Sequence, residues 1–191
     1  MCARPRRQCG VTLVELLAFI VIIGVALAGV LLAVRTAVGS SADPLIQKQM
    51  LAIAESLLEE IESKAFTFCD PSDPNALTAS SPAGCSPGLA VGLGPLPGQS
   101  RYSSTNPFNN VGHYHGFAMN TGILNPADGT PLPGLSAYTA SVTISQVGTS
   151  FGIAATEALQ IDVTVSGPNP TQIPPITLTG YRLRHAPNAV P

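Results

Sequence analysis

The strongest constraint on this chain is an apolar run near its N-terminus. From Leu16 to Val34, 19 consecutive residues include no charge and no Asn, Gln, Ser, Thr or Pro. At about 1.5 Å per residue, a helix of this length spans roughly 28 Å, close to the hydrocarbon thickness of a bilayer. No second run of this kind follows. We therefore expect the chain to cross a membrane once.

Positive charges flank this run unequally. Arg4, Arg6 and Arg7 precede it, and only Arg35 follows it directly. Because cytoplasmic flanks carry the excess of Lys and Arg, we expect a cytoplasmic N-terminus and an exported C-terminal part. The formal net charge is −2, and no basic patch follows the run. The charge pattern therefore gives no argument for a nucleic-acid partner.

The four cysteines agree with export. Cys2 and Cys9 precede the apolar run, whereas Cys69 and Cys85 follow it. If a short leader is removed, two cysteines remain, and they have one possible pairing. Since exported domains meet oxidising conditions, we predict a disulfide between Cys69 and Cys85.

Glu15 places a carboxylate at the start of the apolar run. A carboxylate at membrane depth is unfavourable unless it is paired, which makes Glu15 a candidate functional residue. The alternative is a shallow position beside the lipid headgroups. A secretory signal peptide does not fit, because its apolar core is only about 7–15 residues long and ends in a small-residue cleavage site.

The segment CGVTLVELLAF at 9–19, preceded by a basic leader, resembles the N-terminal signature of type IV pilins and type II secretion pseudopilins. The resemblance implies that a prepilin peptidase cuts between Gly10 and Val11 and methylates the new N-terminus of Val11. Glu15 would then be the fifth residue of the mature chain. Its carboxylate would pair with the Val11 amine of a neighbouring subunit and set the axial register of a filament.

The chain departs from the pattern of major pilins in two ways. Val11 stands where major pilins usually have Phe, and no proline lies between Val11 and Asp43. The segments DPLIQKQMLAIAESLLEEI at 43–61 and FCDP at 68–71 resemble the MSHA-type minor pilins. The resemblance therefore implies a minor pilin that helps to prime or form a surface filament for adhesion or motility.

Three alternatives remain open. The chain could be a pseudopilin of a type II secretion system, an unprocessed signal-anchored enzyme or binding domain, or a tip adhesin. The family resemblance implies a bacterial inner-membrane protein with a periplasmic domain, later part of a pilus or pseudopilus. Its expected partners are the prepilin peptidase/methyltransferase, other pilins, and the inner-membrane assembly platform with its ATPase.

A second helix is predicted after the apolar run. The residues SSADP at 40–44 predict a break and a restart, with Asp43 as N-cap and Pro44 in the first turn. Beyond them an apolar stripe recurs every three or four residues, at Ile46, Met50, Ile53, Leu57 and Ile61. We expect this amphipathic helix to pack on a sheet and the whole helical region to reach about Ala65.

The region 70–134 is the least regular part of the sequence. Twenty of its 65 residues are Pro or Gly, which excludes a single regular element. His113 and His115 could lie on one face of an extended segment, but only Asp128 offers a third ligand. We therefore expect no metal site and no cofactor. No phosphate-binding loop, carboxylate pair or catalytic triad is recognisable, so we do not expect an enzyme.

Three runs of alternating apolar and polar residues follow, starting at Tyr138, Leu159 and Ile176, the last with a change of phase at Gly180. They predict an antiparallel meander. The expected fold is thus α+β and type IV pilin-like, with a long N-terminal helix on a C-terminal antiparallel sheet. The expected parts are a leader (1–10), a transmembrane or filament-core helix (11–35), the amphipathic second half of the long helix (36–66) and a globular domain (67–191) whose meander occupies 135–185.

Overall fold

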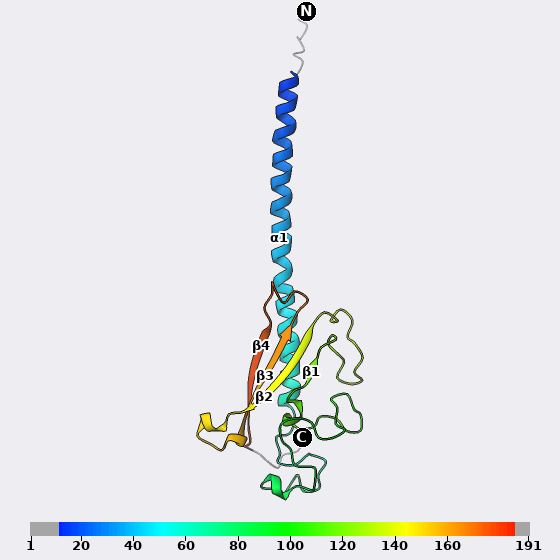
Figure 1. Cartoon of the computed structure of the whole chain (residues 1–191), viewed down its shortest axis with the longest axis vertical. Coiled ribbons are helices and arrows are strands. Elements are labelled where there is room, and N and C mark those ends of the chain that lie inside the picture. Colours follow the sequence, from blue (N-terminus) through cyan, green and yellow to red (C-terminus); the bar gives the residue numbers. More distant parts are fainter. Residues whose placement is uncertain (1–11, 186–191) are drawn as a thin grey trace, which may run out of the picture. The chain divides into compact units, whose positions relative to one another are not determined.

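The computed structural model describes residues 12–185, and for residues 36–43 the backbone alone. The main elements in this part are α1 (Leu13–Glu62), β1 (Ala118–Met119), β2 (Thr139–Gln146), β3 (Ala158–Ser166) and β4 (Ile176–Leu183) (Figure 1). Short 3-10 helices lie between them, at Pro82–Gly84, Val111–Tyr114, Gly148–Phe151 and Ala155–Glu157. The chain divides into two compact units, residues 1–45 and 46–191.

Helix α1 continues through residues 40–44, so the expected break and restart there are wrong. Pro44 lies inside the helix. Proline lacks an N–H and therefore removes one bond to the carbonyl four residues earlier, while the turns on either side keep theirs. The helix ends at Glu62, slightly before the expected Ala65, and the Lys64 N–H then bonds to the Ile61 carbonyl at 3.0 Å.

The four strands form one antiparallel sheet in the order β1-β2-β3-β4. Val142 of β2 lies opposite Val163 of β3, and Ile161 of β3 lies opposite Gly180 of β4. The three predicted strands are therefore present as a meander. The sequence did not predict β1, which has only two residues. The α+β, pilin-like fold class is confirmed.

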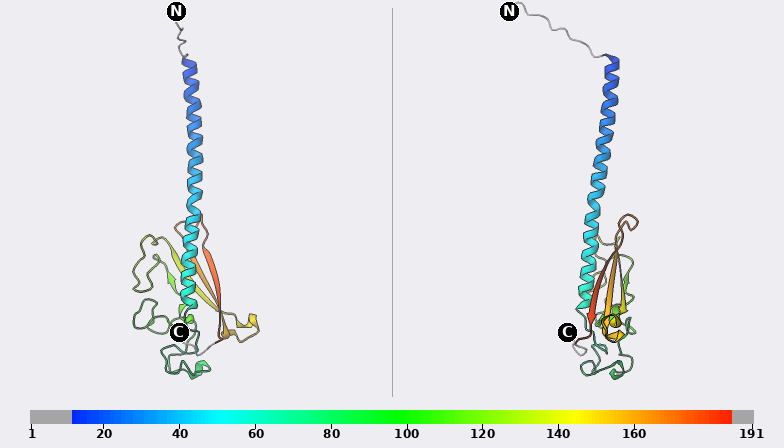
Figure 2. Two further views of the ribbon diagram at one scale, coloured as in Figure 1. Left: turned by 180° about the vertical axis from the view of Figure 1, so that it is seen from behind. Right: turned by 90° about the vertical axis from the view of Figure 1, so that its left-hand side faces the viewer.

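The C-terminal part of α1 packs along one face of this sheet (Figure 2). Met50, Leu57 and Ile61 of the predicted stripe, together with Ala54, are all 3% exposed or less, and Ile46 and Ile53 are partly buried against the same core. Across from them, alternate residues of β2 and β3 close the core, namely Ala140, Val142, Ile144, Leu159, Ile161, Val163 and Val165. The core is thus formed by the residues that alternate along β2 and β3 and by those that recur every three or four positions along α1.

Strand β4 keeps its alternation throughout, so the expected change of phase at Gly180 is wrong. Gly180 is buried, whereas Tyr181 and Leu183 are 50% and 44% exposed. The inward position takes a glycine because α1 lies against it. A Cβ atom there would lie 2.9 Å from Leu58 Cδ1 and closer still to Glu62 Oε1. A glycine inside a strand often marks such a close approach.

An ion pair ties the irregular region to α1. Arg101, whose side chain is 6% exposed, donates to both Glu60 oxygens at 2.9 and 2.5 Å, and the Tyr114 hydroxyl donates to Glu60 at 2.7 Å. Burial alone would raise the pKa of Glu60, but these hydrogen bonds outweigh it and hold the pKa below its usual value. The loops therefore keep a fixed position on the helix without regular secondary structure.

Candidate functional site

The N-terminal end of α1 combines a helix cap with a carboxylate. Thr12 precedes the first helical residue, and its Oγ1 accepts a hydrogen bond from the Glu15 N–H at 3.3 Å. The Leu16 N–H bonds to the Thr12 carbonyl at 3.1 Å. A threonine followed three residues later by a glutamate is the capping-box pattern, and the first turn of a helix favours a negative charge. The Thr12 side chain thus caps the first turn of α1, in which Glu15 lies.

The sequence interpretation assigned a function to Glu15 and none to Thr12. The spacing Thr-x-x-Glu directly before an apolar run was the signal that could have identified the cap. In the structure Glu15 is exposed and lies in the first turn of α1. The Glu15 carboxylate is therefore accessible to a partner group on another molecule.

The residues that follow are apolar and exposed. In the described part of the chain, Leu13–Arg35 is the one helical segment that is long and apolar enough to cross a membrane. None of it is buried within the molecule. Apolar side chains such as Leu13, Phe19 and Ile22, each at least 63% exposed, need a cover of lipid or of other helices.

The leader lies outside the described residues. This part includes the basic residues Arg4, Arg6 and Arg7 and the expected cleavage site between Gly10 and Val11. Of the residues expected to act in processing and assembly near the N-terminus, the structure therefore describes only Glu15.

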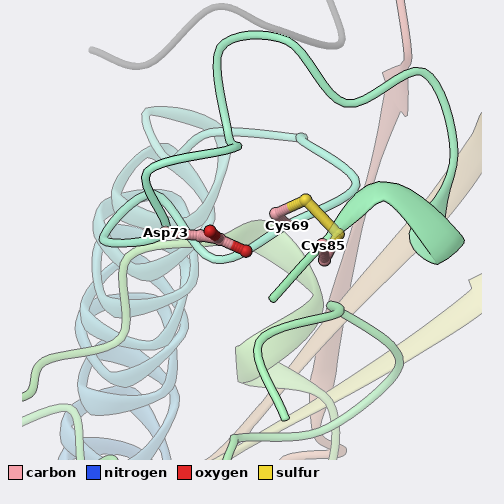
Figure 3. Close-up of side chains that lie close together, drawn as sticks. All are labelled: Cys69, Asp73 and Cys85. Atoms are coloured by element: carbon pink, nitrogen blue, oxygen red, sulfur yellow. A yellow bond between two sulfur atoms is a disulfide. The ribbon is translucent and has the colours of Figure 1, made fainter. Parts of the chain in front are cut away.

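Cys69 and Cys85 form a disulfide, with the sulfurs 2.06 Å apart and the Cα atoms 5.3 Å apart. Asp73 lies beside it, and one ligand atom of each of the three residues falls within 4.8 Å of the others (Figure 3). Metal binding by cysteine requires thiolates, which a disulfide does not offer. The Asp73 carboxylate instead accepts hydrogen bonds from the Asn75 N–H and from the N–H and hydroxyl of Ser86. This group clamps a loop and does not fit a metal.

Asp70 and His113 form a second buried polar group. Asp70 accepts hydrogen bonds from Ser72, Gln99 and Asn109. Burial would raise the pKa of Asp70, but these bonds keep it below its usual value. His113 Nε2 lies 3.9 Å from Asp70 Oδ2, and burial lowers the pKa of this imidazole despite the nearby carboxylate. At neutral pH a buried carboxylate therefore lies beside a neutral imidazole.

The two histidines considered as ligands do not face a common point in an extended segment. His113 belongs to the 3-10 helix Val111–Tyr114, and His115 follows as its C-cap. His115 Nδ1 accepts the Ile144 N–H at 3.1 Å, while exposed Asp128 bonds to Thr130 in its own loop. The expectation of an extended segment is wrong, and each side chain has a separate role.

An apolar N-terminal helix combined with a four-stranded antiparallel sheet is the architecture of a pilin-like protein. Residues 5–31 match the family model for the prokaryotic N-terminal methylation motif. The match supports a type IV pilin-like protein, and the motif implies processing by a prepilin peptidase and assembly with other pilins. No curated protein and no solved structure matches the chain.

The matched motif includes Thr12 and Glu15 and covers most of the apolar segment Leu13–Arg35. It suggests a structural rather than an enzymatic protein. The single apolar segment Leu13–Arg35 fits a membrane-anchored pilin. The candidate functional site is accordingly the start of α1, where the motif includes Thr12 and Glu15.

Proposed function

We propose that this chain is a minor pilin of an MSHA-like type IV pilus, which helps to prime or form a surface filament for adhesion or motility. The observation that carries the proposal is the methylation motif at 5–31, with Glu15 exposed in the first turn of an apolar helix. Such a protein acts by assembly and needs no cofactor of its own.

In this proposal residues 1–10 form a leader, and its basic residues hold it in the cytoplasm. Cleavage after Gly10 creates the Val11 amine, which is then methylated. Residues 11–35 anchor the subunit in the inner membrane and later enter the filament core. Residues 36–66 connect this anchor to the globular domain at 67–191, which lies in the periplasm before assembly.

The assembly chemistry rests on one pair of charges. A mature N-terminus carries a positive amine at neutral pH, and Glu15 offers a carboxylate one turn further along the helix. In an apolar filament core either charge alone is strongly unfavourable. A subunit therefore settles where the Glu15 carboxylate meets the Val11 amine of its neighbour, and this contact sets the axial register.

Each expected partner performs one step of assembly. A prepilin peptidase/methyltransferase processes the leader, and other pilins supply the neighbouring helices. The inner-membrane assembly platform and its ATPase drive the subunits out of the membrane. Mutual contacts between apolar helices replace the lipid that covers Leu13–Arg35 before assembly.

Substitution Glu15→Gln tests the pairing. The amide keeps nearly the same size but cannot neutralise an amine, so we expect normal leader cleavage and a marked loss of subunit from sheared filaments. Immunoblots of membrane and filament fractions measure both. Asp128→Asn, which changes an exposed carboxylate in a loop, should assemble as the wild type does. Wild-type incorporation of Glu15→Gln would contradict the pairing.

A pseudopilin of a type II secretion system is the second candidate, because the same motif at 5–31 serves both assemblies. Deletion of the gene separates the two. Loss of surface filaments with normal secretion supports the pilus, and loss of secretion supports the pseudopilus. A signal-anchored binding domain is a third candidate and would keep its leader.

A further inference from the structure

The chain covers one of the two long edges of its sheet. On the β2 edge the Val142 N–H donates to the Phe117 carbonyl at 2.9 Å, and the Val142 carbonyl accepts the Gly116 N–H at 3.1 Å. The Ile144 N–H donates to the imidazole of His115 at 3.1 Å. The segment that leads into β1 therefore satisfies the backbone groups along this edge.

Strand β4 forms the opposite edge of the sheet (Figure 1). Just beyond this strand, the Arg184 N–H bonds to the Glu157 carbonyl. Because bonded residues alternate along an antiparallel pair, Thr177, Thr179 and Tyr181 point their N–H and C=O groups away from β3. These groups have no backbone partner within the described part of the chain. We call them the β4 edge.

The β4 edge lacks the features by which exposed edges usually avoid other strands. Protected edges are short, carry bulges, or contain proline or lysine. β4 has eight residues, pairs with β3 without a bulge, and contains neither proline nor lysine. The side chains at the edge positions, Thr177, Thr179 and Tyr181, are uncharged and of types that favour strands. The β4 edge is therefore suited to accept a further strand.

The flank of α1 beside β4 carries carboxylates. Leu58 and Glu62 lie against Gly180 of β4. At 3.6 residues per turn, exposed Glu55 lies within about 60° of Leu58 around the helix axis. Neither Glu55 nor Glu62 belongs to an ion pair within the described residues, and the basic residue of β4, Arg182, forms none with them. The helix-facing side chains of an added strand would thus meet two unpaired carboxylates.

An exposed aromatic pair lies on the opposite face of β4. Tyr181 and Phe151 are 50% and 51% exposed, and their rings meet edge to face with the centroids 5.9 Å apart. Exposed apolar side chains that gather in this way mark interaction surfaces. Since side chains alternate between the two faces of a strand, every second residue of an added strand would lie on this aromatic face.

We propose that the β4 edge binds an extended segment of another protein as a fifth, antiparallel strand. Basic residues of the segment face Glu55 and Glu62, and the residues between them are apolar and contact Tyr181 and Phe151. Backbone hydrogen bonds supply the affinity, and the two sets of side chains supply the selectivity. This inference goes beyond the proposed function and holds for a pilus and for a pseudopilus alike.

Binding of a synthetic peptide to the full chain in detergent tests the proposal. The probe is acetyl-Val-Lys-Val-Lys-Val-Lys-Val-amide, in which apolar and basic residues alternate. Hydrogen exchange, resolved to single amides, should slow at Thr177, Thr179 and Tyr181 when the peptide is added. Unchanged exchange at these three amides would overturn the proposal.

Two N-methylated forms of the peptide separate strand addition from a general attraction of basic peptides. In the added strand the valine N–H groups bond to β4, because directly bonded residues share a face, and the lysine N–H groups point away. Methylation of the valine nitrogens should weaken binding about tenfold or more, and methylation of the lysine nitrogens by about twofold or less. Equal weakening by both would overturn strand addition.

Charge selection is tested on the protein. The double change Glu55→Gln and Glu62→Gln should weaken binding of the peptide about fivefold, because it removes both carboxylates from the helix flank. Asp128→Asn, an exposed change in the loop before β2, should leave binding unaltered. Wild-type affinity in the double variant would overturn the choice of a basic segment.

The protein without peptide tests the other occupant, a second copy of the chain. We expect fast exchange at Thr177, Thr179 and Tyr181 at every protein concentration. Slow exchange at these amides that increases with protein concentration would show that β4 pairs with a second copy, and it would overturn the proposal of a separate partner.

Discussion

His113 is the most unusual single residue of the globular unit. Its side chain is fully buried, and neither ring nitrogen has a hydrogen-bond partner in the described structure. Asp70 is close at 3.9 Å, but its oxygens already accept bonds from Ser72, Gln99 and Asn109. The fold therefore holds a neutral imidazole and resists its protonation.

This arrangement makes stability depend on pH. The unfolded chain binds a proton at His113 with a pKa near 6.5, whereas burial lowers the pKa in the fold. The neutral His113 side chain contributes fully to the free energy of unfolding above about pH 6.5. As the pH falls below this value, the free energy of unfolding declines by up to about 1.4 kcal/mol per pH unit. Urea unfolding of the full chain in detergent, between pH 7.5 and 5, should show this decline.

The matched variant is His113→Leu, which removes the titrating group and should flatten the pH dependence below 6.5. His185→Gln changes an exposed histidine and should keep the wild-type dependence. An unchanged slope in His113→Leu would show that the acid sensitivity arises elsewhere.

The sequence points to some of these residues and not to others. Glu15 stands out because a carboxylate in an apolar run is chemically unusual, and its pairing with the Val11 amine stays a prediction. The burial of His113 was missed, because it depends on how residues 66–73 and 108–114 fold over one another. A local pattern of two histidines cannot reveal this long-range packing.

At the scale of elements, the contact between α1 and β4 depends on Gly180. The glycine lets the backbone of the strand approach Leu58 and Glu62 more closely than a side chain allows. The sequence signal was present, since an isolated glycine in a strand pattern indicates a bulge or a close approach. The glycine therefore marks a close approach and not a change of phase, because the alternation continues through β4.

Substitution Gly180→Ala tests this contact. The added methyl group must displace Leu58 and Glu62 or push β4 away from the helix, so we expect a loss of about 1–3 kcal/mol in the free energy of unfolding. Thr177→Ala, on the exposed face of the same strand, removes only an exposed hydroxyl bond to Thr164 and should cost less, about 0.2–1 kcal/mol. Equal effects of the two changes in urea unfolding would contradict the close approach.

The strands were predictable because each has a clean alternation over its length. The continuity of α1 was not, because the sequence around Pro44 contains the usual signals for a helix start. In the structure, however, residues on both sides of Pro44 are helical, and α1 continues through it. The two-residue strand β1 has no periodicity to detect.

For the whole molecule, the apolar run predicted one membrane segment, and the amphipathic stripe with three strands predicted the α+β domain. The structure of the irregular region, residues 70–134, could not be predicted from sequence periodicity. Its position depends on particular long-range bonds, such as Arg101 to Glu60 and Gln99 to Asp70, which no sequence period encodes. The fold class thus follows from periodicity, whereas the loop structure follows from individual polar contacts.

We propose that the working molecule begins at Val11, and mass spectrometry of the N-terminal peptide, from protein isolated from its native membrane, measures this start. We expect a peptide that starts at a methylated Val11, and a peptide that retains the leader when the prepilin peptidase is deleted. An intact Met1 in the wild-type cell would rule out cleavage and identify Leu13–Arg35 as an ordinary signal anchor.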